Sequence, residues 1–153
     1  MKVSVPVWLL WVSVVALFNS LPLHAQLNQA RIAQNRLQSG KWENASRLLK
    51  KSIHKDTSDI ESHVVLVQWS LATGNPDYHV DSADYYLRKS KFLFDSLTLR
   101  ERERIQRFPV DSIVLNAWRI RVDSLAFEEA KQVNTEAEYI RYLMRFPKAR
   151  QTP

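Results

Sequence analysis

The side chains best suited to metal chemistry are the four histidines of this 153-residue chain. They are His24, His54, His63 and His79. Two zinc ligands on one helix are usually four residues apart, and a complete site needs further His, Cys or carboxylate ligands. No two histidines here have that spacing, and the chain contains no cysteine. We therefore expect no metal site, no cofactor and no disulfide.

Two pairs of carboxylates could serve acid–base catalysis by residue type, Asp81 with Asp84 and Glu128 with Glu129. Such catalysis needs carboxylates in a pocket that shifts their pKa values. Both pairs fall in helical segments, where charged residues usually face solvent or cap the helix. The chain has two glycines, far apart in sequence, so it has no phosphate-binding or dinucleotide-binding loop. The sequence favours a protein that is not an enzyme and has no catalytic residues.

Residues 1–25 have the layout of a secretory signal peptide. Lys2 supplies the positive start, 3–18 are almost wholly apolar, and Pro22 precedes a small residue, Ala25. The apolar run is shorter than the roughly 20 residues of a membrane-spanning helix. We expect cleavage after Ala25 rather than an uncleaved anchor, which leaves no stable membrane span. The lack of cysteine then favours a periplasmic or secreted protein of a Gram-negative envelope.

The formal net charge of +6 is spread along the chain. A nucleic-acid binder would concentrate lysine and arginine on one face, whereas 100–104 alternate in sign. A more one-sided basic run, Arg141, Arg145, Lys148 and Arg150, suits the end of a helix, where cations are favoured, and an acidic docking partner is the alternative. We expect no nucleic-acid partner.

Segment 37–53 is typical of a helical hairpin. Gly40 can adopt the left-handed conformation that ends a helix, here predicted at 27–38. Trp42, Ala45 and Leu49 then share one face of a second predicted helix, 43–54. Because glycine is scarce and no alternating apolar pattern occurs, the sequence predicts an all-α fold of about six to seven helices.

Ser/Thr-x-x-Glu capping boxes predict three more helix starts, at Ser58, Thr98 and Thr135. We expect the first of these helices to end at 73, before Gly74, and two others to start at Asp81 and after Asp111. The helix after Asp111 is predicted at 112–132. The expected buried positions are Ile60, Val64, Val67 and Leu71; Ala83, Tyr86, Leu87, Ser90 and Phe94; Ile113, Ala117, Ile120 and Phe127; and Ile140, Leu143 and Met144. We expect Trp42, Trp69 and Trp118 in the core and His63 at the surface or in a groove.

The helix pairs around the two glycines are related. Ala45 follows Gly40, and Ala83 follows Gly74 after a longer loop. Each alanine precedes a leucine by four residues, Leu49 in one pair and Leu87 in the other. The chain therefore resembles the tetratricopeptide repeat family, in which a Gly-x-aromatic-x-x-Ala turn joins two helices. The residues that carry the resemblance are Gly40, Trp42, Ala45, Gly74, Ala83 and Leu87.

A third unit, 116–147, lacks the turn glycine but ends in Arg-Phe-Pro. It is similar to degenerate repeats in envelope proteins of Gram-negative bacteria. The resemblance covers 27–147 and implies a right-handed stack of antiparallel helix pairs with a peptide- or protein-binding groove. It also implies that first helices line this groove, which makes Arg31, Asn35 and Gln68 candidate groove residues.

The domain expected after the signal is thus a tetratricopeptide-like unit at 26–147, followed by a frayed tail at 148–153. The favoured hypothesis is a non-catalytic scaffold or adaptor that binds a protein or peptide in the envelope. An accessory N-terminal domain of a larger envelope enzyme or transporter is one alternative, and a glycan-binding helical module is another. Because no polar capping helix follows Pro147, we also expect either a homodimer or a covalent downstream domain.

Overall fold

The computed structural model describes residues 22–105, 108 and 110–147, and this part of the chain contains helices and no strand. Its elements are α2 (Pro22–Gln38), α3 (Trp42–Lys55), α4 (Ile60–Ser70), α5 (Val80–Ser96), α6 (Leu99–Ile105), α7 (Ser112–Val133) and α8 (Glu136–Arg145). The predicted all-α class is confirmed. Most of the expected signal, 1–21, and the expected tail, 148–153, lie outside the described residues, and α2 begins at Pro22.

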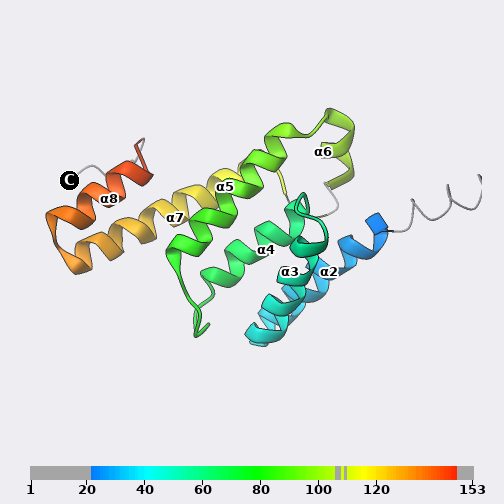
Figure 1. The fold of residues 1–153 in the computed structure, drawn as a ribbon, viewed down its shortest axis with the longest axis horizontal. Helices are drawn as coiled ribbons and strands as arrows, with labels where there is room; N and C mark the ends of the chain where they lie inside the picture. The colour runs from blue at the N-terminus through cyan, green and yellow to red at the C-terminus, as the bar shows by residue number, and fades with distance from the viewer. Residues whose placement is uncertain (1–21, 106–107, 109, 148–153) are drawn as a thin grey trace, which may run out of the picture.

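The helices form an elongated row, with α2 and α3 towards one end and α8 at the other (Figure 1). Packing follows the order of the chain: α2 on α3, α3 on α4, α4 on α5, α5 on α7, and α7 on α8. In addition, α2 lies against α4. Helix α4 thus has neighbours on several sides, and every residue in it except Gln68 is buried. Such a helix is apolar around most of its circumference because little of its surface faces water.

The turn after α2 forms as the sequence predicts. Gly40 has φ +70°, and its N–H donates to the carbonyl O of Leu37 at 3.0 Å. The N–H of Lys41 donates to the carbonyl O of Arg36 at 2.9 Å. These two bonds are the Schellman motif, which satisfies the last helical carbonyls when a residue in the left-handed region follows the helix.

The end of α4 differs from the prediction. The helix stops at Ser70 rather than at 73, and Gly74, with φ +83°, lies in the following turn. The side chain of Asn75 donates to the carbonyl O of Trp69 at 2.6 Å. Asn75 therefore satisfies the carbonyl of Trp69 in the last turn of α4, and the helix ends three residues before the predicted position. Helix α5 likewise begins at Val80 rather than at Asp81, with His79 as its cap.

Two capping boxes and the Asp111 cap are placed as predicted. The hydroxyls of Thr98 and Thr135 each accept from the N–H three residues later at 3.4 Å, and Asp111 Oδ1 accepts from the Val114 N–H at 2.7 Å. The predicted cap at Ser58 is wrong. Asp59 caps α4 instead, because its carboxylate accepts both from the Ser62 N–H at 3.0 Å and from the Ser52 hydroxyl of α3 at 2.6 Å.

The buried faces predicted for α4 and α5 are confirmed, except that Tyr86 is only half-buried. Those predicted for α7 and α8 are wrong. Ile113 is 77% exposed and Met144 is 79% exposed. The buried positions of α7 are Leu115, Val122, Ala126 and Ala130, and those at the end of the chain are Tyr142 and Phe146. Ala117, Ile120, Ile140 and Leu143 are exposed too, while Phe127 is half-buried. Helix α7 has apolar residues on opposite sides, and its contacts with α5 and α8 select the side that is buried.

Of the three tryptophans expected in the core, Trp69 is buried, whereas Trp42 and Trp118 are half-buried and pack against the core. The indole N–H of Trp69 donates to the carbonyl O of Trp42 at 3.1 Å. This bond joins α4 to the first residue of α3, so the first helix pair is tied directly to the second.

Candidate functional site

The first candidate surface is the α2–α4 seam, which we define as Arg31, Gln34 and Asn35 of α2 with Glu61 and Gln68 of α4. The Gln34 amide donates to Gln68 Oε1 at 3.4 Å across the two helices. Arg31 and Asn35 are exposed, whereas Gln34 and Gln68 are half-buried. The two helices thus present a row of polar side chains to solvent along their contact.

Glu61 is the unusual member of the seam. It lies seven residues before Gln68, which places both on the α2-facing side of α4. Glu61 is 5% exposed, and its Oε1 is buried without a hydrogen-bond partner among the described residues. Burial raises its pKa to about 7, the negative charge of Asp59 adds to this effect, and the positive charge of Arg31 opposes it. A buried carboxyl with an unused acceptor is costly to the fold, which is why such groups often mark functional sites.

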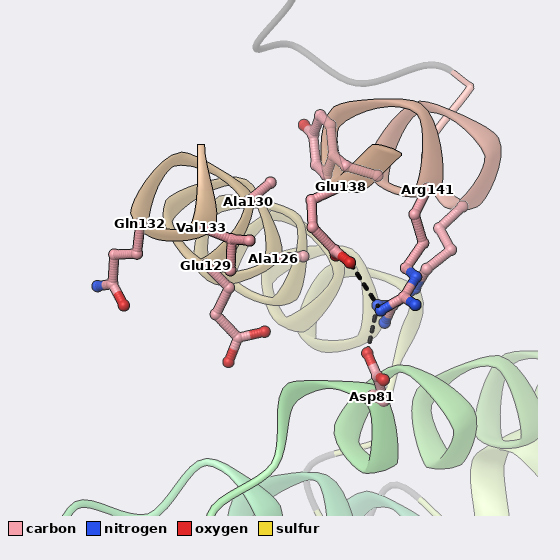
Figure 2. Close-up of a pocket in the computed structure, with 10 residues that line it drawn as sticks. Asp81, Ala126, Glu129, Ala130, Gln132, Val133, Glu138 and Arg141 are labelled. Carbon is pink, nitrogen blue, oxygen red and sulfur yellow. Dashed lines mark hydrogen bonds and ion pairs between the residues drawn. The ribbon is translucent and has the colours of Figure 1, made fainter. Parts of the chain in front are cut away.

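The second candidate surface is a cavity of about 340 Å³ where the start of α5, the second half of α7 and α8 meet. We call it the Glu129 pocket. Its lining residues are Asp81, Ala126, Glu129, Ala130, Gln132, Val133, Glu138, Arg141, Tyr142 and Arg145. Figure 2 shows Glu129 projecting from α7, Glu138 and Arg141 projecting from α8, and Asp81 rising towards them from α5.

Ion pairs hold the α5 and α8 sides of this pocket together. Arg145 pairs with Asp81 and lies 3.3 Å from Asp84 Oδ2. Arg88 also pairs with Asp84, at 3.0 Å, and donates to the carbonyl O of Arg145 at 3.1 Å. These contacts join two helices that are far apart in the chain. A second cavity, of about 430 Å³, adjoins the first and shares Asp81, Arg141 and Arg145 with it.

Tyr142 anchors α8 on α7 beneath the pocket. Its hydroxyl donates to Asp123 Oδ1 at 2.6 Å, and its ring packs against those of Phe127 and Phe146. Burial raises the pKa of Tyr142, and the hydrogen bond to Asp123 raises it further. The phenol therefore stays protonated and serves as a hydrogen-bond donor that positions α8.

The structure places the predicted repeat residues at helix junctions. Gly40 and Gly74 have positive φ, and Trp42 opens α3. Ala45 and Ala83 are fully buried where helices approach closely, and Leu87 is buried as well. Of the predicted groove residues, Gln68 contacts α2 through Gln34, Arg31 is close enough to Glu61 for its charge to act on it, and Asn35 is exposed on α2.

Two of the carboxylates singled out by residue type, Asp81 and Glu129, both line the Glu129 pocket, and no histidine is among its lining residues. His63 is buried, contrary to prediction, and its Nδ1 is 2.7 Å from the carbonyl O of Asp59. Burial lowers the pKa of His63. Glu128 forms an exposed pair with Lys131. In the part of the chain that the structure describes, no three His, Cys, Asp or Glu residues are placed to hold a metal ion.

The sequence did not reveal that Glu61 is buried, because its spacing from Ser58 matches a capping box, in which the glutamate faces solvent. It also did not reveal the contacts of Arg145. The basic run near the end of the chain hinted at an acidic partner. Within the chain, Asp81 and Asp84 pair with one member of that run, Arg145. No periodicity relates residues about 60 positions apart, so only the fold could reveal these pairs.

Among the residues described, no helix is long and apolar enough to cross a membrane. No family model, no curated protein and no solved structure matches this chain significantly.

Proposed function

We propose that this chain is an exported, non-catalytic helical-repeat protein that binds a protein or peptide partner in the bacterial envelope through the α2–α4 seam. The observation that carries the proposal is the pairing of α2 with α4 through Gln34 and Gln68, which lie 34 residues apart. The same spacing separates Gly40 from Gly74. A period of 34 residues is that of the tetratricopeptide repeat.

The chemistry of the seam supports binding of an extended or helical peptide. Arg31, Asn35 and the two glutamines supply donors and acceptors that a peptide backbone can use. The unpartnered Oε1 of Glu61 supplies a further acceptor at the buried edge of this row.

A steric block tests the binding surface. Asn35→Trp places a bulky side chain on the seam, and Lys51→Trp places the same side chain on an exposed position of α3. Both positions are exposed, so both variants should fold, which circular dichroism can check. We expect the chain and Lys51→Trp to recover the same partner from envelope extract, and Asn35→Trp to recover at least about tenfold less.

Equal recovery by the two variants would show that the partner binds elsewhere. Recovery of no specific partner by the folded chain would count against the binding function itself. Export is tested separately, by expressing the chain in a Gram-negative host and sequencing the N-terminus of the periplasmic product. The proposal expects that product to begin at Gln26, and a product confined to the cytoplasm would contradict export.

A further inference from the structure

The charges in the Glu129 pocket do not balance. Arg145 pairs with Asp81, and Arg141 Nη1 lies 3.2 Å from Glu138 Oε1. Glu129 has neither an ion pair nor a hydrogen bond from its side chain within the described residues. Among the described residues that line the pocket, Glu129 is therefore a carboxylate without a direct ion pair, although the charges of His79 and Arg145 act on it from a distance.

The surroundings of Glu129 favour a cation. Burial raises the pKa of Glu129, and the nearby charge of Asp81 raises it further, while His79 and Arg145 oppose this shift. Burial raises the pKa of the nearby Tyr78 phenol, and the charge of Glu129 raises it further. In addition, the pocket adjoins the C-terminal turn of α7, where the helix dipole attracts positive charge. An incoming cation would relieve the repulsion between Glu129 and Asp81.

The shape of the pocket favours an aliphatic chain behind that cation. Ala126 and Ala130 are buried in α7, and Val133 lies one turn later on the pocket wall. Methylene groups can pack on such a surface while a charged head reaches a polar group beyond it. Arg141 and Arg145 already occupy the α8 side, so the remaining space suits a compact charge better than a second planar guanidinium.

We propose that the Glu129 pocket binds an aliphatic primary ammonium group, with the ammonium on Glu129 and the methylenes over Ala126, Ala130 and Val133. This site is distinct from the α2–α4 seam and does not depend on the function proposed for the seam. A lysine side chain of a protein and a free alkylamine share the required chemistry.

Amide chemical shifts of the ¹⁵N-labelled chain can test the proposal. The probes are N-acetyl-lysine methylamide, its norleucine counterpart without the charge, and n-pentylamine. We expect the lysine probe to cause saturable shifts around Ala126–Val133 and Asp81, and the norleucine probe to cause none. Stronger binding of the lysine probe than of pentylamine assigns the pocket to a protein lysine, and equal binding assigns it to free amines.

Two neighbouring glutamates give a matched pair of variants. Glu129→Gln removes the unpaired carboxylate, whereas Glu128→Gln removes an exposed carboxylate that pairs with Lys131. Since both side chains are exposed, neither change should unfold the chain. We expect Glu129→Gln to weaken binding of the lysine probe about tenfold or more and Glu128→Gln to leave it unchanged, because hydrogen bonds to charged groups are the strong ones.

Three outcomes would overturn the proposal. The first is equal binding of the lysine and norleucine probes, which would make the charge irrelevant. The second is equal weakening by the two substitutions, which would indicate a diffuse charge effect. The third is an absence of saturable shifts in the pocket of the folded chain. None of these outcomes bears on binding at the α2–α4 seam, which the Asn35→Trp variant tests separately.

Discussion

Glu61 lies on the proposed interaction surface and also lowers the stability of the fold. Its carboxyl is buried in α4, and one oxygen has no hydrogen-bond partner within the described residues. Ionising such a group without a partner costs free energy, so the folded chain holds its proton to a higher pH than the unfolded chain does. The raised pKa of Glu61 therefore gives a measurable signature in the stability of the protein.

The first prediction concerns Glu61→Gln, which mimics the protonated acid. Below about pH 4.5 the carboxyl is protonated in both the folded and the unfolded chain, so the variant and the wild type should be equally stable. As the pH rises from about 4.5 to the folded pKa of about 7, the unfolded chain releases this proton while the folded chain keeps it, so the wild type loses stability and the variant does not. We expect the difference in the free energy of unfolding to reach about 3 kcal/mol at most above pH 7.

Urea unfolding at a series of pH values measures this difference. Glu43→Gln is the control, because Glu43 is exposed in the first turn of α3. The free energy of unfolding of Glu43→Gln should depend on pH as that of the wild type does. If Glu61→Gln also kept that dependence, Glu61 would have to be ionised and satisfied in the folded chain, and the seam would lose its unpartnered acceptor.

At the scale of elements, α8 is held on the rest of the molecule by a few contacts. Tyr142 and Phe146 bury its inner side, and Arg145 pairs with both Asp81 and Asp84 of α5. Its outer side exposes Met144, so burial of apolar surface contributes from one face alone. The ion pairs of Arg145 are thus a substantial part of what orients α8 and closes one side of the Glu129 pocket.

The second prediction is that Arg145→Ala loosens α8 without affecting the first helix pair. The free energy of unfolding should fall by about 1 kcal/mol, because the ion pairs of Arg145 are partly exposed and Asp84 keeps its pair with Arg88. Hydrogen exchange should show faster exchange of the amides of α8 and unchanged exchange in α3.

Arg141→Ala is the comparison for this measurement. Arg141 pairs with Glu138 within the same helix and is largely exposed, so its loss should cost only about 0.2–0.5 kcal/mol. If both alanine substitutions changed hydrogen exchange in α8 equally, the ion pairs between α5 and α8 would not contribute to the stability of α8.

At the scale of the whole molecule, the row of helices has few contacts between its ends. Packing runs from α2 through α3, α4, α5 and α7 to α8, with additional contacts of α2 with α4 and of Arg145 in α8 with α5. In such an arrangement, stability is approximately a sum of local and nearest-neighbour terms. Opening of one end therefore need not open the other end.

The third prediction compares two core truncations at opposite ends of the row, Leu49→Ala in α3 and Val122→Ala in α7. Both side chains are fully buried, so each substitution leaves a cavity, and the leucine change should cost about 2–5 kcal/mol. Leu49→Ala should speed hydrogen exchange mainly in α2, α3 and α4, and Val122→Ala mainly in α7 and α8. Uniform acceleration along the chain by either variant would instead indicate a single cooperative unit.

Much of the fold could be predicted because it depends on local chemistry. The left-handed conformation at Gly40, the caps at Thr98 and Asp111, and the absence of strands in the described part all follow from residue type and short spacing. The buried face of α5 was also predictable, since its positions Ala83, Leu87 and Phe94 define one side by period alone. Errors of a few residues arose where a distant side chain changed a helix end, as Asn75 does for α4.

The sequence by itself thus determined the helical class, the hairpin turns and the polar row from which the α2–α4 seam is built. Only the tertiary structure decided which face of α7 is buried, because Ile113 and Leu115 are equally apolar and lie on opposite sides. It alone also brought Asp81 to Arg145 across 64 residues. The physical reason is that helix formation depends on neighbours within about one turn, whereas burial and ion pairing depend on which helices meet in space.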